Sequence, residues 1–122
     1  MSLSTQSNVA LLCVELDRKA NEYRDIATTR ANAEVDYKAA RARRRVQARI
    51  DGAKSVAEAE MLTDADPSIE VLWRAHLIAD AVADAAAKSL FALRTRIEFG
   101  RSVIATERAG DVFHAAGLSG AA

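Results

Sequence analysis

A seven-residue repeat between Ile69 and Ile104 constrains the fold of this chain more than any other feature of its sequence. The first and fourth positions of five successive heptads are mostly apolar, and they are Ile69, Leu72, His76, Ala79, Ala83, Ala86, Leu90, Leu93, Ile97, Gly100 and Ile104. This spacing places them on one stripe of a helix, and it predicts a long helix that packs along a second helix. Such a chain offers few concave places for an active site.

A second long helix is expected from Ser7 to Asp51, because that stretch contains neither glycine nor proline. It has a heptad of its own, whose apolar positions are Val9, Leu12, Leu16, Tyr23, Ile26, Ala33, Tyr37 and Ala40. Polar side chains such as Lys19 and Arg44 occupy other positions of the same register, so the stripe becomes more polar toward its end. At 1.5 Å per residue, this helix is about 65 Å long.

A short connection joins the two long helices. Gly52 ends the first helix, because glycine accepts the left-handed conformation that follows many helices. The spacing of Ser55 and Glu58 is typical of a capping box, with Ser55 as the N-cap and Glu58 reaching back to its backbone. These signals predict a short helix over residues 56–62.

The second long helix of the pattern begins at Asp66-Pro67, where Asp66 is the N-cap and Pro67 takes the first helical position. We expect it to end near Arg108, because glycines and other small residues follow. Residues 1–109 are therefore predicted to form one helical-hairpin domain, and residues 110–122 a flexible tail.

The predicted fold is all-α, a long antiparallel helical hairpin that resembles a coiled coil and contains a short connecting helix. Two long helices joined by so short a connection lie antiparallel. If the chain folds back near residue 59, Tyr37 lies across from about Ala81, and Tyr23 from about Thr95.

The helix of residues 67–108 carries more apolar surface than one partner helix covers. Five side chains beside its heptad stripe form a second apolar line, and they are Val71, Ile78, Val82, Phe99 and Val103. A two-helix hairpin is only marginally stable alone. We therefore expect self-association through this line into a helical-bundle oligomer.

Gly100 lies in the heptad stripe, where glycine costs about 1 kcal/mol relative to alanine. Its presence there predicts a close contact with the neighbouring helix.

A run of basic residues is the strongest chemical signal in the chain, and the candidate phosphate contacts within it are Lys38, Arg41, Arg44, Arg45 and Arg49. Arginines at helical spacing can follow a phosphate backbone without sequence preference. Acidic residues follow directly, however, and mutual neutralisation with Glu58, Glu60 and Asp64 is the favoured interpretation. No aromatic residue is interspersed with the arginines to stack on a base.

Three large apolar side chains, Trp73, Leu77 and Phe91, lie off both apolar lines. Either the short helix covers Trp73 and Leu77, or these residues anchor a protein partner, as exposed tryptophan does at interface centres. His76 has Asp80 one turn later but no further ligand near it, so a buried polar position is favoured over a metal site.

Other features argue against catalysis, cofactors and membranes. The chain has no phosphate-binding loop, no zinc spacing and no nucleophile arrangement, so we expect no enzyme activity, no metal, no cofactor and no small-molecule substrate. The formal charge is zero, and no apolar stretch approaches the roughly 20 residues that span a bilayer. Cys13 is the single cysteine and is expected to be a small buried residue, which fits a reducing cytoplasm.

Three segments of the chain resemble small all-helical proteins of phages and prophages, and they are Tyr37–Arg43 (YKAARAR), Gly52–Glu60 (GAKSVAEAE) and Lys88–Arg108 (KSLFALRTRIEFGRSVIATER). The resemblance covers about residues 12–108. Proteins of this group are encoded in early gene clusters near recombination and replication functions, which implies location in the host cytoplasm. The resemblance assigns no activity to any residue.

Three functions are therefore open. The favoured one is a non-enzymatic helical assembly protein of phage type, which binds a protein partner. The alternatives are an accessory protein that binds nucleic acid through the basic run of residues 38–54, and a structural component of the virion such as a connector or scaffold.

Overall fold

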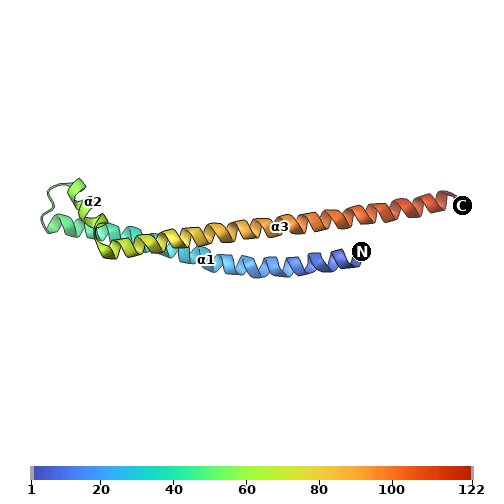
Figure 1. Cartoon of the computed structure of the whole chain (residues 1–122), viewed down its shortest axis with the longest axis horizontal. Helices are drawn as coiled ribbons and strands as arrows, with labels where there is room; N and C mark the ends of the chain where they lie inside the picture. The colour runs from blue at the N-terminus through green and yellow to red at the C-terminus, as the bar shows by residue number, and fades with distance from the viewer. Residues whose placement is uncertain (1, 122) are drawn as a thin grey trace. The chain divides into compact units, whose positions relative to one another are not determined.

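The chain folds into three α-helices, in a computed structural model that describes residues 2–121 and the side chains of residues 4–114. The helices are α1 (Ser2–Ile50), α2 (Val56–Asp64) and α3 (Pro67–Ala121) (Figure 1). No strand occurs among the described residues. The all-α helical hairpin predicted from the two heptads is confirmed.

The connection between α1 and α2 uses the residues that the sequence marks, with one difference in detail. Gly52 has a φ of 113°, and Ser55 accepts a hydrogen bond from the backbone N–H of Glu58 at 3.1 Å. The Glu58 carboxylate, however, accepts from the backbone N–H of Lys54 at 2.9 Å and not from that of Ser55. The capping box therefore closes one residue further back than expected, and it still satisfies two donors at the helix start.

Helix α3 begins where expected and ends later. Asp66 accepts hydrogen bonds from the backbone N–H and the hydroxyl of Ser68, at 2.9 and 2.8 Å, and Pro67 is the first helical residue. The helix then continues to Ala121, so the end predicted near Arg108 is wrong. Glycine in a helix costs only about 1 kcal/mol, and the alanines of this stretch offset that cost. The flexibility of residues 110–122 stays a prediction.

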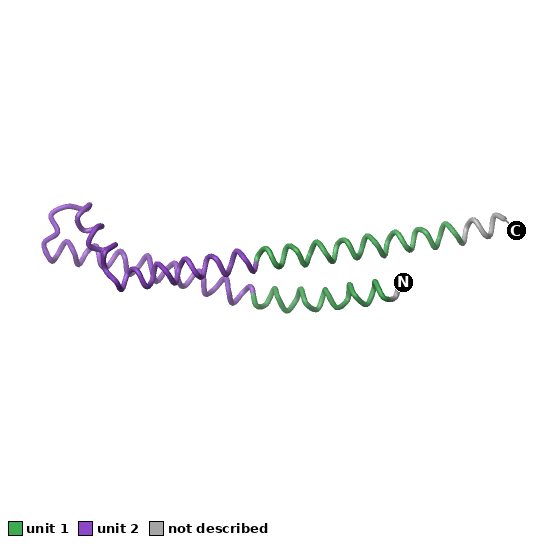
Figure 2. Tube along the Cα trace, viewed as in Figure 1, with its two compact units in different colours: residues 1–22, 87–122 green, residues 23–86 purple. Residues whose placement is uncertain are grey.

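The described chain divides into two compact units, and the single domain expected for residues 1–109 stays a prediction. Unit 1 contains residues 1–22 and 87–122, and unit 2 contains residues 23–86 (Figure 2). Each unit has a segment of α1 and an antiparallel segment of α3, and unit 2 also contains α2.

The buried side chains of α3 all belong to the predicted heptad stripe. Ile69, Ala79 and Ala83 are buried in unit 2, and Leu90, Leu93 and Ile97 are buried in unit 1. The stripe assignment is therefore confirmed in both units. At the connection in unit 2, three small residues form a further buried cluster, and they are Ala48, Ala53 and Ala59.

The register of the two long helices in unit 2 differs from the prediction. Tyr37 lies beside Trp73 and His76, with ring centroids 5.1 and 5.9 Å away, so its expected place across from Ala81 is wrong. The reason is that α2 runs back along the last turns of α1, with Glu60 beside Arg45. Helix α3 therefore starts level with an earlier part of α1, and every residue of α3 in this unit is displaced relative to a simple fold-back.

Candidate interaction surfaces

The apolar heptad side chains of α1 are only partly buried in the hairpin. The apolar residues of its heptad, from Val9 to Ala40, are all intermediate in exposure, and Ala48 near its end is the one α1 residue that is buried among those described. Helix α3 buries its heptad stripe but exposes the second line. Val71, Ile78, Val82 and Phe99 are exposed, and Val103 is intermediate. The hairpin therefore leaves apolar surface on both helices in contact with water.

In unit 2, part of this exposed surface forms an apolar groove between the two helices. Ile26 of α1 lies on one side, and Ile78 and Val82 of α3 lie on the other. Asp25 and Thr29 contribute the polar part of the α1 side. The groove thus combines two residues of the predicted self-association line with the heptad residue Ile26, which the sequence assigned to the interior.

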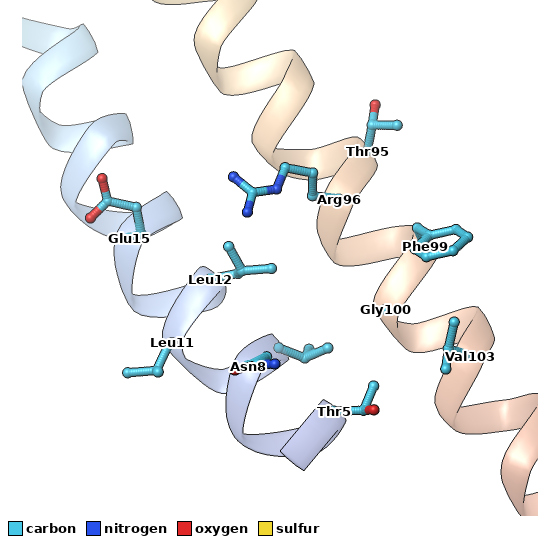
Figure 3. Close-up of a pocket in the computed structure, with 11 residues that line it drawn as sticks. Thr5, Asn8, Leu11, Leu12, Glu15, Thr95, Arg96, Phe99, Gly100 and Val103 are labelled. Atoms are coloured by element: carbon cyan, nitrogen blue, oxygen red, sulfur yellow. The ribbon is translucent and has the colours of Figure 1, made fainter. Parts of the chain in front are cut away.

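In unit 1, a larger groove lies between the start of α1 and the later part of α3. Its volume is about 980 Å³, against about 450 Å³ for the groove in unit 2. Apolar side chains line most of it, and they are Val9, Leu11, Leu12, Phe99 and Val103. Figure 3 shows Leu12 and Arg96 directed into the space between the helices, while Leu11 and Phe99 point outward along its two edges.

Gly100 of α3 lines this groove together with Val9 of α1. A Cβ atom built at Gly100 would lie 2.6 Å from Cγ2 of Val9, which is closer than two carbon atoms can approach without a shift. The predicted close contact at Gly100 is confirmed, and the neighbouring atom belongs to an α1 side chain.

An aromatic cluster occupies the seam of unit 2. The rings of Tyr37 and His76 are stacked at an interplanar angle of 4°, and Trp73 lies tilted against both. The Trp73 residue is still 42% exposed, and Leu77 is 46% exposed. Helix α2 therefore does not cover these two residues, and Tyr37 of α1 takes part of that role. Phe91 is exposed as well and belongs to unit 1.

The arginines of the basic run are paired with acids of the connection. Arg41 Nε lies 3.4 Å from Asp64 Oδ1, and Arg45 Nη1 lies 3.6 Å from Glu60 Oε1. Both pairings confirm the neutralisation that the sequence favours. Arg44 Nε donates to Asp66 Oδ2 at 2.8 Å, while Glu58, the third acid expected to take part, accepts from the backbone N–H of Lys54.

Asp66 contacts both Arg44 of α1 and Ser68 at the start of α3. Its carboxyl has a pKa below the ordinary value, first because Ser68 donates to it from the hydroxyl and the backbone N–H, and then because Arg44 lies beside it. One side chain therefore caps α3 and ties the start of that helix to α1.

The two remaining candidates for phosphate contact also have partners within the chain. Lys38 Nζ lies 2.7 Å from Glu34 Oε1, and this pair raises the pKa of Lys38 and lowers that of Glu34. Arg49 donates to the carbonyl oxygen of Ala53 at 3.2 Å. Nucleic-acid contact by this run stays a prediction, and it requires these side chains to exchange their present partners for phosphates.

Two single residues named from the sequence are His76 and Cys13, and Nδ1 of His76 is buried without a hydrogen-bond partner among the described residues. His76 is half-buried in the seam, and its Nε2 lies 3.6 Å from Asp80 Oδ2. Cys13 is half-buried, not fully buried, and its Sγ lies 4.0 Å from Nη2 of Arg101.

Within residues 2–121, no group of three or more candidate ligands lies close enough together to hold a metal ion. In the same range, no helix has both the length and the apolar character needed to cross a bilayer.

No protein-family model matches this chain, and comparisons with curated proteins and with solved structures find no similar protein. The functional argument therefore rests on the surfaces themselves.

The α1 contribution to these grooves was missed in the sequence. Leu11 was assigned to no surface, and Leu12 was assigned only to the seam. A signal was present, because Val9 to Val14 is a nearly continuous apolar run. Such a run extends around more of the helix than a single packing stripe requires.

Proposed function

We propose that this protein is a non-enzymatic helical interaction protein that assembles with other protein chains through the apolar helix faces its own fold leaves uncovered. The observation that carries the proposal is the exposed second line of α3, in which Val71, Ile78 and Phe99 are each more than half exposed. Large apolar side chains grouped on one helix face are typical of protein-binding surfaces.

The total accessible surface of the chain also supports assembly with other chains. The chain exposes 8855 Å², whereas a compact folded monomer of 13.1 kDa exposes about 6,400 Å². The excess is about 2,500 Å² of polar and apolar surface together, and its apolar part would contribute about 25 cal/mol per Å² when buried. Association with another chain is the direct way for this protein to gain that stabilisation.

Site-specific photo-crosslinking in cells tests the proposal. A photoreactive residue at Ile78, which is 64% exposed, should form an adduct with another polypeptide. The matched control is Thr28, which is exposed on α1 in the same unit and off the heptad stripe. The proposal is refuted if Ile78 forms no protein adduct, or if it forms no more adduct than Thr28.

The phage-type origin and the cytoplasmic location belong to this proposal as well. They are supported by the resemblance of Lys88–Arg108 and by the lone Cys13, which forms no disulfide within the chain. Gene neighbourhood provides the test. Genes for recombination and replication beside this one would support the proposal, and a position among capsid and tail genes would favour a virion component.

A further inference from the structure

We infer that the groove of unit 1 binds a second copy of this chain. The grooves of the two copies then face each other across a two-fold axis parallel to the helices. This inference rests on the proposed function and names its partner. It concerns unit 1 alone, whose two helical segments both contribute to the groove.

The shape of the groove suits a pair of helices. Val9 and Leu12 of α1 and Gly100 of α3 line it, and the missing side chain at Gly100 allows the two helices to approach closely. Leu11 and Phe99 form apolar ridges at its two edges, with their side chains pointing away from the opposite helix (Figure 3). A helix-packing partner needs such ridges to insert between its own side chains.

The edges of the groove are complementary to each other. A two-fold axis along the groove brings the α1 edge of one copy against the α3 edge of the other at the same height. Leu11 of one copy would then pack against Phe99 of the second copy. In the same arrangement, Glu15 on the α1 side would meet Arg96 on the α3 side.

The charges support a second copy over an unrelated partner. Among the described residues, no carboxylate lies within ion-pair distance of Arg96, although it points into the groove (Figure 3). Glu15 already accepts a hydrogen bond from Arg18 of its own helix at 3.0 Å, and a carboxylate has capacity for a further donor. A groove with an acid on one side and a base on the other is complementary to a second copy of itself turned about the two-fold axis.

The interface of a stable dimer buries a characteristic range of area. Obligate dimers bury about 2,000–5,000 Å² in total, which is about 1,000–2,500 Å² from each chain. The chain exposes about 2,500 Å² more than a compact monomer of its mass, counted over both units, so the groove of unit 1 supplies only part of that excess.

Light scattering combined with size-exclusion chromatography tests the inference on the full chain. The wild type should have twice the mass of the 13.1 kDa chain. Phe99→Glu should weaken the dimer by about 30-fold or more, as expected for loss of an interface hot spot. Phe91→Glu is the matched control, because Phe91 is in the same helix and unit, is equally exposed at 72%, and does not line the groove.

A charge exchange provides the second measurement. Arg96→Glu should weaken the dimer, because it places two acids together, and the double variant Glu15→Arg/Arg96→Glu should restore it. Circular dichroism checks that each variant stays helical. A monomeric wild type, equal effects at Phe99 and Phe91, or no recovery in the double variant would each overturn the inference. A monomer that still crosslinks to another polypeptide at Ile78 would refute only the second copy, and the proposed function would stand.

Discussion

Replacing Gly100 by alanine tests how closely α1 and α3 pack in unit 1. Alanine is better than glycine in a helix by about 1 kcal/mol. At this position, however, the new Cβ would lie 2.6 Å from Cγ2 of Val9, and overpacking of this kind costs about 1–3 kcal/mol. We therefore expect Gly100→Ala to change the free energy of unfolding by between roughly zero and a loss of about 2 kcal/mol. Gly100→Leu should cost more, because it adds three further carbon atoms.

The sign of the Gly100→Ala effect should depend on Val9. Val9→Ala removes the methyl group that the new Cβ meets, so only the gain in helix propensity remains. In the Val9→Ala background, Gly100→Ala should therefore stabilise the chain by about 1 kcal/mol. The double-mutant cycle should yield a coupling free energy of about 1–3 kcal/mol between the two positions.

The assay is denaturant unfolding followed by circular dichroism, at one fixed chain concentration because association also stabilises the fold. The control is Gly110→Ala, since a Cβ at Gly110 meets nothing within 4 Å. It should stabilise by up to about 1 kcal/mol in both backgrounds. The reasoning is refuted if Gly100→Ala stabilises the chain equally with Val9 and with Ala at that position.

Three further predictions concern the connection in unit 2. Gly52→Ala should destabilise by about 1–2 kcal/mol, because a φ of 113° strains any residue with a Cβ although the space around it is open, and denaturant unfolding would show no loss if this is wrong. The carboxyl of Asp66 has a lowered pKa in the folded state, so its stabilisation is present above the ordinary carboxyl pKa and is lost as the pH falls through the lowered value. The melting temperature of Asp66→Asn, which keeps the cap, should therefore fall less steeply with acid than that of the wild type, and equal slopes would contradict the pairing. Replacing Arg41, Arg44 and Arg45 together by Glu should lower the melting temperature modestly, because each faces an acid of α2 or of the start of α3. Wild-type retention of DNA at physiological salt, lost in that triple variant with melting unchanged, would instead establish the nucleic-acid function.

The connection between the long helices illustrates what short-range chemistry can predict. Ser55, Asp66 and Pro67 act through atoms within three residues of themselves, so their roles follow from the sequence and are found in the structure. The partner of Arg44 did not follow in this way. Asp66 is 22 positions away along the chain, and it reaches Arg44 only because α2 runs back along α1.

The residues that line the groove of unit 1 could likewise be predicted only in part from the sequence. Phe99 and Val103 were recognisable as surplus apolar residues on α3, because the helical period separates them from the buried stripe. Leu11 and Arg96 could not be placed at its edges from the sequence, since that position depends on which turn of α1 faces which turn of α3.

The set of helices and the face that each helix buries follow from the sequence alone. Burial follows a local period of 3.5 residues, which is why Ile69, Ala83 and Ile97 are buried where the heptad places them. The register between the helices, by contrast, is a property of the tertiary structure, in which Tyr37 lies beside Trp73 and not Ala81. Register depends on the path of the connection through space, and a small change in that path moves every contact along two long helices.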